Sequence, residues 1–203
     1  MIYVVLGAPG VGKGTRAKVI CEKLGIPHIS TGSLIRESKE IFEKYKSMMG
    51  DGKLLPDEAI KEMLVERLKK EDAKNGFVLD GYPRTLNQVK DLDEILESMG
   101  KAITKAFLFE APEEEIYNRA LNRRICVPCD LIYGWGKGAE APKTCEKCGR
   151  ELTVRSDDNP ETIKRRLEVY HSQIDPIIEH YKNQGVLEVI DALESKEKVL
   201  ESV

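Results

Sequence analysis

A glycine-rich turn with one lysine is the first stretch of the chain that could bind phosphate. Residues 7–15 read Gly-Ala-Pro-Gly-Val-Gly-Lys-Gly-Thr, the G-x-x-x-x-G-K spacing of a phosphate-binding loop. Gly10 and Gly12 can adopt positive φ and let backbone N–H groups surround an anion, while Lys13 adds a full positive charge. Gly14 departs from the general pattern, which has Ser or Thr there. We predict a nucleotide-binding loop made of Gly10, Val11, Gly12, Lys13, Gly14 and Thr15.

The flanking residues predict that this turn joins a strand to a helix. Residues 2–6 form an apolar, β-branched run, and residues 17–24 carry apolar side chains at helical spacing before Gly25. Such a turn lets a helix N-terminus, with its partial positive charge, face a phosphate group. A glycine-rich connection without a ligand is the alternative. The lysine and both flanking elements favour phosphate binding.

One aspartate and several arginines could complete a site for phosphoryl transfer. Asp80 ends the apolar run 77–79, as a carboxylate that holds hydrated Mg²⁺ would, although it could instead cap the following turn. Guanidinium groups bind phosphate oxygens in a bidentate manner and stay charged near neutral pH. Any single arginine could equally be a surface charge. The candidates near predicted strand ends, or at the edges of residues 125–158, are Arg36, Arg84, Arg119, Arg123, Arg155 and Arg166.

Four cysteines have the spacing of a metal site. Cys126 and Cys129 form one C-x-x-C pair, and Cys145 and Cys148 form another after fifteen residues. Two such pairs present four thiolates, which can close a tetrahedral zinc site and leave no open position for water. We therefore predict a structural zinc that stabilises a segment poor in apolar residues. Reduced, metal-free cysteines are the alternative.

Composition limits the classes of function. The chain has 203 residues, 41% of them hydrophobic and 33% charged, with a formal net charge of −3. This charge gives no general attraction to nucleic acid or anionic membranes, and no apolar run approaches the ~20 residues of a membrane span. We expect one domain, a monomer, in the cytoplasm, without nucleic-acid or membrane partners.

Strands alternate with helices along the chain, which predicts an α/β fold with a doubly wound, five-stranded parallel sheet and helices on both faces. The predicted strands are 2–6, 26–30, 77–80, 106–109 and 186–190. Helices are predicted over 17–24, 33–49, 87–99 and 112–124, with others beginning at Pro56 and after Asn159 and a short one at the C-terminus. Ligands bind beyond the C-terminal ends of such strands, where the sequence places residues 7–15, 30–32 and 80–84.

With these motifs the chain resembles the adenylate kinases from end to end. Residues 7–15 and Asp80-Gly81-Tyr82-Pro83-Arg84-Thr85 together are specific to nucleoside monophosphate kinases. Ser30-Thr31-Gly32, Asn122-Arg123-Arg124 and Arg155-Ser156-Asp157-Asp158 extend the match. The resemblance implies one P-loop kinase domain over residues 1–203, with a monophosphate-binding helical insertion over 30–55 and a zinc-binding lid over 122–159. It also implies reversible transfer of the terminal phosphoryl group of MgATP to AMP, giving two ADP.

The resemblance assigns roles residue by residue. The residues that would hold AMP are Thr31, Arg36, Lys53, Leu54, Leu55, Gly81, Tyr82, Pro83, Arg84, Gln88, Arg155 and Arg166, with the Gln88 amide at the adenine edge. Beyond the loop, ATP would be met by Arg119, Arg123, Ile132, Tyr133 and Leu193. The catalytic set would be Lys13, Asp80, Arg84, Arg119, Arg123, Arg155 and Arg166. Asp157 and Asp158 would pair with arginines as the lid closes.

Some positions depart from the family pattern and leave other functions open. Ser33 stands where Asp usually follows Ser-Thr-Gly, and Ala192 stands where Gly often follows the Asp, next to the expected contact at Leu193. The insertion is also short. A kinase for UMP, CMP or GMP is the nearest alternative. A zinc-knuckle nucleic-acid binder with an ATPase-like core is a more distant one, disfavoured because the lid lacks a dense basic patch interleaved with aromatic residues.

Overall fold

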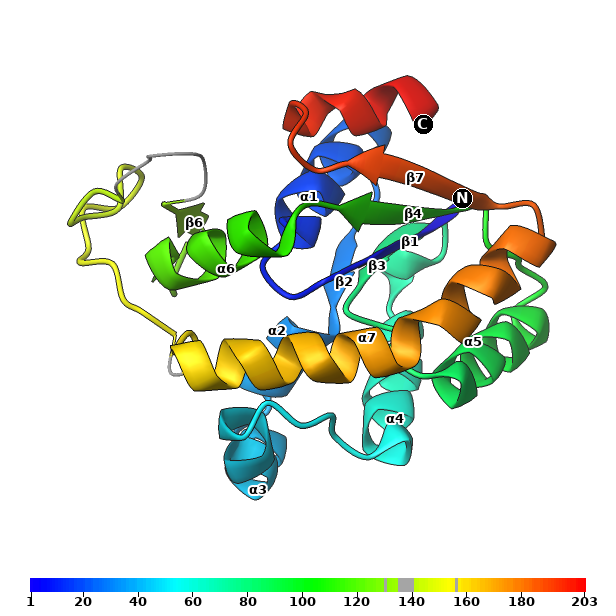
Figure 1. Cartoon of the computed structure of the whole chain (residues 1–203). Coiled ribbons are helices and arrows are strands. Elements are labelled where there is room, and N and C mark those ends of the chain that lie inside the picture. Colours follow the sequence, from blue (N-terminus) through cyan, green and yellow to red (C-terminus); the bar gives the residue numbers. More distant parts are fainter. Residues whose placement is uncertain (130, 135–140, 156) are drawn as a thin grey trace.

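A parallel sheet forms the centre of the protein in the computed structural model, which describes residues 1–129, 131–134, 141–155 and 157–203 (Figure 1). Its strand order is β2-β3-β1-β4-β7, and every neighbouring pair is parallel, as predicted. After β1 the chain passes to the edge strand β2 and returns to β3, and it then crosses to β4 and β7 on the other side, so the strand order reverses at β1. The strands are β1 (Ile2–Gly7), β2 (His28–Ser30), β3 (Phe77–Asp80), β4 (Lys105–Glu110) and β7 (Leu187–Asp191).

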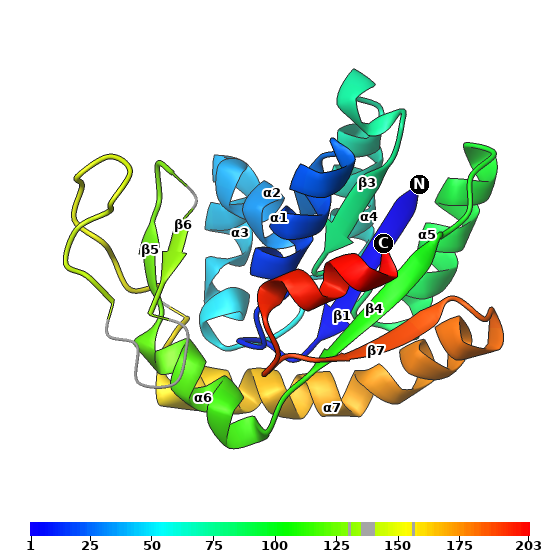
Figure 2. The ribbon, with the colours of Figure 1, turned by 90° about the horizontal axis from the view of Figure 1, so that it is seen from above.

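Helices cover both faces of the sheet, and this explains why β1 is apolar at every position. Ile2, Val4 and Leu6 pack into one core cluster, whereas Tyr3 and Val5 pack into the other. Successive side chains of a strand point to opposite faces, so a strand between two helical layers needs apolar residues at every position. One cluster includes α4 (Asp57–Leu68), α5 (Leu86–Ser98) and α7 (Pro160–Asn183), and the other includes α1 (Lys13–Leu24), α6 (Glu113–Asn122) and η2 (Lys196–Ser202). Figure 2 shows η2 beside α1.

The insertion after β2 differs from the single helix predicted over 33–49. It consists of α2 (Thr31–Glu37) and α3 (Lys39–Gly50), which are separated at Ser38. Ser38 has extended backbone angles, and its hydroxyl accepts a 3.3 Å hydrogen bond from the Ile41 N–H. Serine is a strong N-cap residue, so it begins a new helix where the apolar spacing predicted a continuous one. A short 3₁₀ turn, η1 (Glu71–Ala73), follows α4.

A second small sheet forms the base of the cysteine-rich segment, where the sequence indicated no regular element. Strands β5 (Arg124–Cys126) and β6 (Leu131–Tyr133) are antiparallel. Among the described residues of this segment, the buried members of its cluster are Cys126, Cys145 and Leu152. So small an apolar core cannot by itself hold a segment of this length.

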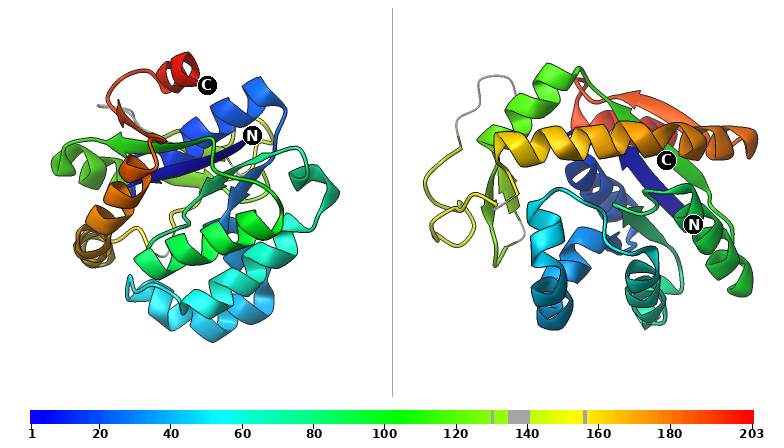
Figure 3. Two further views of the ribbon diagram at one scale, coloured as in Figure 1. Left: turned by 90° about the vertical axis from the view of Figure 1, so that its right-hand side faces the viewer. Right: turned by 60° about the horizontal axis from the view of Figure 1, so that its bottom comes forward.

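Two segments that leave the main sheet, α2 with α3 and β5 with β6, lie near the same end of α7 (Figure 3). Figure 3 shows the residues around α3 and those around β5 and β6 near the N-terminal end of this helix. The Thr162 hydroxyl on α7 donates a 2.8 Å hydrogen bond to the Gly50 carbonyl at the end of α3. Thus the first turns of α7 hold the end of α3 as well as packing into the core through Ile163.

Candidate active site

A cleft of about 520 Å³ opens beyond the C-terminal ends of β1, β2 and β3. It lies where the strand order reverses, the position at which doubly wound sheets bind ligands. Lys and Arg residues outnumber Asp and Glu residues in its lining. From the glycine-rich loop, Asp80 and the lid, the predicted site residues that line it are Gly10, Gly12, Lys13, Gly14, Thr15, Asp80, Arg119, Arg123, Ile132, Arg155 and Arg166. The residues expected to hold AMP that also line it are Thr31, Arg36, Lys53, Leu54, Leu55, Gly81, Pro83, Arg84 and Gln88.

The glycine-rich loop forms the floor of this cleft as an anion-binding turn. Gly12 is the N-cap of α1 and has φ 97°, a left-handed conformation that favours glycine. In this part of the chain, all of which the structure describes, no side chain caps the helix and its first turn has no acidic residue. The first N–H groups of α1 therefore point toward the cleft with the positive end of the helix dipole.

Lys13 lies across this loop. Its Nζ donates hydrogen bonds of 2.7 Å to the Gly7 carbonyl and 2.9 Å to the Ala8 carbonyl. Burial lowers the pKa of Lys13 to about 7; Asp80 opposes that shift, and Arg84, Arg166 and other arginines add to it. The protein alone therefore stabilises the ammonium group poorly. A bound phosphate would provide the negative charge that it lacks.

Asp80 is held as a carboxylate beside the loop. Burial alone would raise its pKa, but the hydrogen bond with His28 and the charges of Lys13 and Arg84 bring the pKa below its ordinary value. His28 Nε2 lies 3.2 Å from Asp80 Oδ2. This oxygen also explains Gly14, because a Cβ at that position would lie only 3.2 Å from it. A Ser or Thr in place of Gly14 would crowd the carboxylate.

The arginines come from separate elements and converge on the cleft. Arg84 follows β3, Arg155 lies between the cysteine-rich segment and α7, and Arg166 lies on α7. Burial lowers the pKa values of Arg84 and Arg155 to about 10, and neighbouring arginines contribute to both shifts. These groups remain charged at neutral pH. The buried Arg155 Nε has no hydrogen-bond partner among the described residues, as expected for a group that awaits an anion.

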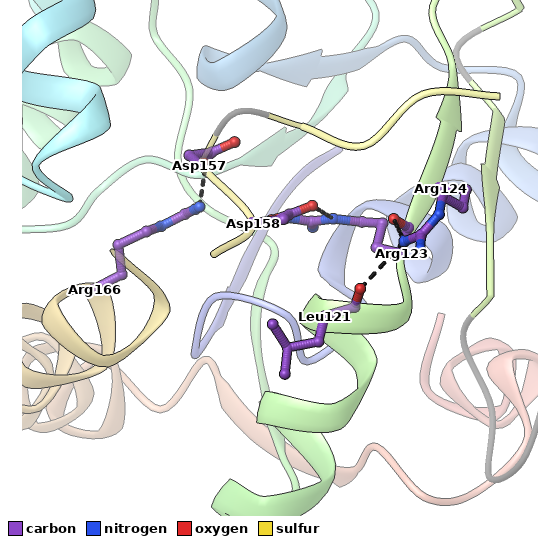
Figure 4. Close-up of polar contacts among 6 residues, drawn as sticks. All are labelled: Leu121, Arg123, Arg124, Asp157, Asp158 and Arg166. Atoms are coloured by element: carbon purple, nitrogen blue, oxygen red, sulfur yellow. Dashed lines mark hydrogen bonds and ion pairs between the residues drawn. The ribbon is translucent and has the colours of Figure 1, made fainter. Parts of the chain in front are cut away.

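Carboxylates at the lid junction pair with arginines, as expected (Figure 4). Arg123 binds Asp158 through two hydrogen bonds, one of them 2.8 Å from Nε to Oδ2. Arg166 Nη1 lies 2.5 Å from Asp157 Oδ2. Arg124 has another role: it donates 3.2 and 2.9 Å hydrogen bonds to the carbonyls of Leu121 and Arg123 at the end of α6. Ser156, within the same motif, lies outside the described residues.

The other half of the cleft is built around the end of β3 and the start of α5. The Thr31 hydroxyl donates a 2.9 Å hydrogen bond to the Gly81 carbonyl. The same carbonyl accepts a 2.7 Å hydrogen bond from Arg84 Nε. Gln88 is 2% exposed and lines the cleft. Lys53, Leu54 and Leu55, between α3 and α4, lie on the same side. These residues and the glycine-rich loop line the same cleft.

The structure places four of the expected site residues outside the cleft lining. Val11 and Tyr82 are fully buried in the two core clusters. The Tyr133 hydroxyl lies 3.3 Å from Cys145 Sγ and accepts a 3.2 Å hydrogen bond from the Glu146 N–H, so this side chain faces the cysteines, whereas we expected it at the nucleotide. Leu193 is 53% exposed, and its N–H bonds to Asp191. In this conformation these four side chains do not contribute to the cleft surface.

The four cysteines come together as their spacing predicted. The Sγ atoms of Cys126, Cys129, Cys145 and Cys148 all lie within 4.8 Å of one another. Tetrahedral thiolates about 2.3 Å from zinc stand about 3.8 Å apart, so the set can close on one ion with small adjustments. Cys21, the remaining cysteine, lies on α1.

Sequence reasoning missed two residues that shape the site. Asp57, at the first position of α4, accepts a hydrogen bond of 2.6 Å from Gln88 Nε2. His28 holds Asp80. Asp57 is one of the acidic residues that are common in a first helical turn, and His28 in a short strand belongs to no motif. The neighbouring sequence therefore gave no sign that either residue shapes the site.

The loop, the fold and the ring of arginines define a class of protein: a P-loop enzyme that transfers phosphoryl groups between nucleotides. Comparison with known proteins identifies the family within that class. The family model described as adenylate kinase matches residues 5–186. The chain belongs to the adenylate kinase family.

Several curated relatives named adenylate kinase match nearly the whole chain. The protein of Lachnospira eligens is 42% identical over 100% of this chain and 98% of its own length. The protein of Caldicellulosiruptor bescii is 46% identical over 93% of this chain and 90% of its own length. The protein of Thermotoga neapolitana is 43% identical over 94% of this chain and 90% of its own length. No helix in the described parts of the chain is long and apolar enough to cross a membrane.

Proposed function

We infer that the protein catalyses reversible transfer of the terminal phosphoryl group of MgATP to AMP, giving two ADP. The observation that carries this inference is one cleft with two unlike halves and positive charge between them. The glycine-rich loop and Lys13 form one half, and Thr31 with Gln88 marks the other. Arg84 and Arg166 lie in the same lining.

The chemistry requires alignment and charge dispersal rather than a covalent intermediate. Lys13 and the N–H groups of α1 would hold the phosphates of ATP, and Arg119, Arg123 and Ile132 would contact the rest of that nucleotide. Arg36 and Arg84 would bind the phosphate of AMP. Arg155 and Arg166 would neutralise charge on the group in transfer, an effect worth roughly 10³–10⁵ in rate for one well-placed arginine. Closure of the lid would exclude water and so prevent hydrolysis of ATP.

Two metals fit the residues. The ionised Asp80 beside Gly14 is placed to hold the water shell of the Mg²⁺ that accompanies ATP. The four cysteines fit a structural zinc, which would stabilise the lid but take no part in transfer. A monomer acting in the cytoplasm stays our expectation; light scattering of the purified protein tests the first part.

The test is ADP production from MgATP with AMP, CMP, UMP or GMP offered separately. Lys13→Met protein serves as the blank, because it removes the charge at the loop and keeps a long side chain. We expect ADP with AMP and its loss in the variant. A faster reaction with another monophosphate would make the protein a kinase for that nucleotide. No transfer to any of them would refute the proposal, and a salt-sensitive gel shift would then test nucleic-acid binding.

A further inference from the structure

Two hydrogen-bond partners fix the carboxamide of Gln88 in one orientation and exclude the one rotated by about 180°. Its Oε1 accepts a 2.7 Å hydrogen bond from the Arg84 N–H, and its Nε2 donates a 2.6 Å bond to Asp57 Oδ1. A rotated amide would turn its NH₂ group toward the N–H of Arg84 and its oxygen toward the carboxylate. Both contacts would be repulsive, because a backbone N–H can only donate and a carboxylate can only accept.

Asp57 is itself held in place by the start of α5. Its Oδ2 accepts a 3.1 Å hydrogen bond from the Thr85 hydroxyl. Thr85 is the N-cap of α5, and its hydroxyl oxygen accepts a 3.1 Å hydrogen bond from the Gln88 N–H. Each carboxylate oxygen therefore has its own partner. This arrangement joins the first turn of α4 to the first turn of α5 and leaves the amide little freedom to rotate.

Two hydrogen-bonding positions of the amide remain for a ligand. Nε2 has a second hydrogen and Oε1 has a second lone pair. Since Gln88 lines the cleft, a base there would meet a donor and an acceptor in a fixed order. Adenine offers the complementary order, because its exocyclic amino group donates and the adjacent ring nitrogen accepts. A 6-oxo purine offers the opposite order on its Watson–Crick edge.

We propose that Asp57 is a specificity-determining residue: by fixing the Gln88 carboxamide, it makes the monophosphate half of the cleft select a purine with an amino group beside a ring nitrogen over a 6-oxo purine. This inference rests on the proposed function and adds a residue to it. Asp57 is a positioning residue that acts through Gln88 and has no contact of its own with the base.

Inosine monophosphate is the sharpest probe, because it differs from AMP only by an oxo group and a protonated ring nitrogen at this edge. We expect Asp57→Ala to lower the ratio of kcat/KM for AMP to that for IMP by roughly five- to ten-fold, since a matched pair of hydrogen bonds to a base discriminates by this order or more. The Arg84 N–H still favours the original orientation, so the preference falls without reversing. KM for AMP should rise more than kcat falls.

Two control variants separate specificity from stability. Glu58→Gln removes an exposed carboxylate from the same turn of α4 and should change neither the ratio nor the stability. Thr85→Ala removes the cap of α5 and the second partner of Asp57; it should lower the melting temperature and change the ratio by less than about two-fold. A ratio that falls equally in Thr85→Ala and Asp57→Ala would overturn the specific role of Asp57.

The unaltered enzyme supplies a test that needs no variant. Purine riboside monophosphate keeps the accepting ring nitrogen and lacks the amino group, so it should bind more weakly than AMP and more tightly than IMP. IMP binding as well as this analogue would refute the fixed orientation, as would an unchanged ratio in a folded Asp57→Ala protein. Failure of the unaltered enzyme to phosphorylate AMP at all would instead refute the proposed function.

Discussion

Proton uptake on nucleotide binding is a direct consequence of the environment of Lys13. Burial lowers the pKa of this lysine to about 7. A phosphate placed against Nζ favours the charged form and returns the pKa toward 10.5, its ordinary value. The complex therefore holds more protons than the free protein at any pH between these two values.

The sign and size of the effect follow by linkage. Below pH 7 the lysine is charged in both states, so its contribution to affinity is fully present. As the pH rises above 7 the free protein loses the proton that the complex needs, and this group weakens binding by up to about ten-fold per pH unit until the pKa of the complex is reached. At pH 8 binding should take up about 0.9 proton through Lys13.

Isothermal titration calorimetry with MgATP, without AMP, measures this uptake. The binding enthalpy is recorded at pH 8 in two buffers that differ in ionisation enthalpy, and their difference gives the number of protons taken up. Lys13→Met corrects for titration of the nucleotide itself, and Lys13→Arg retains a charge that does not titrate in this range. Equal uptake by the unaltered protein and by both variants would show that Lys13 is already charged in the empty cleft, against the reasoning from burial.

Two further predictions concern the lid. Treatment with a chelator, or Cys145→Ser, should lower the melting temperature and the metal content, because the cluster around the cysteines buries three of its described residues. Cys21→Ser alters a cysteine outside the set and should keep the metal. A protein that loses no stability without the metal would contradict the structural role. Asp158→Asn should reduce the free energy of unfolding by roughly 1–3 kcal/mol, because it leaves the Arg123 guanidinium without its buried carboxylate. Asp157→Asn, whose side chain is 29% exposed, should cost less in the same denaturant titration, and equal losses would count against burial as the cause.

What the sequence determined by itself is the chemistry that depends on short spacing. The run from Gly7 to Thr15 specifies an anion-binding turn because glycine conformation and one lysine act within a few residues of each other. The two C-x-x-C pairs specify a thiolate cluster for the same reason. The alternation of strands and helices was enough to predict a five-stranded parallel sheet and the edge at which ligands bind.

Only the tertiary structure decided which side chains meet across the chain. The Asp57–Gln88 pair spans 31 positions, and the His28–Asp80 pair spans 52, so neither has a local signature. Tyr133 follows a predicted contact residue, Ile132, yet it faces Cys145 because successive residues of β6 point to opposite sides. The break at Ser38 has a local cause instead, because its hydroxyl caps α3 three residues on and outweighs a weak apolar pattern. Residue types and spacing define the reactive groups, whereas their orientation depends on partners that folding brings from distant parts of the chain.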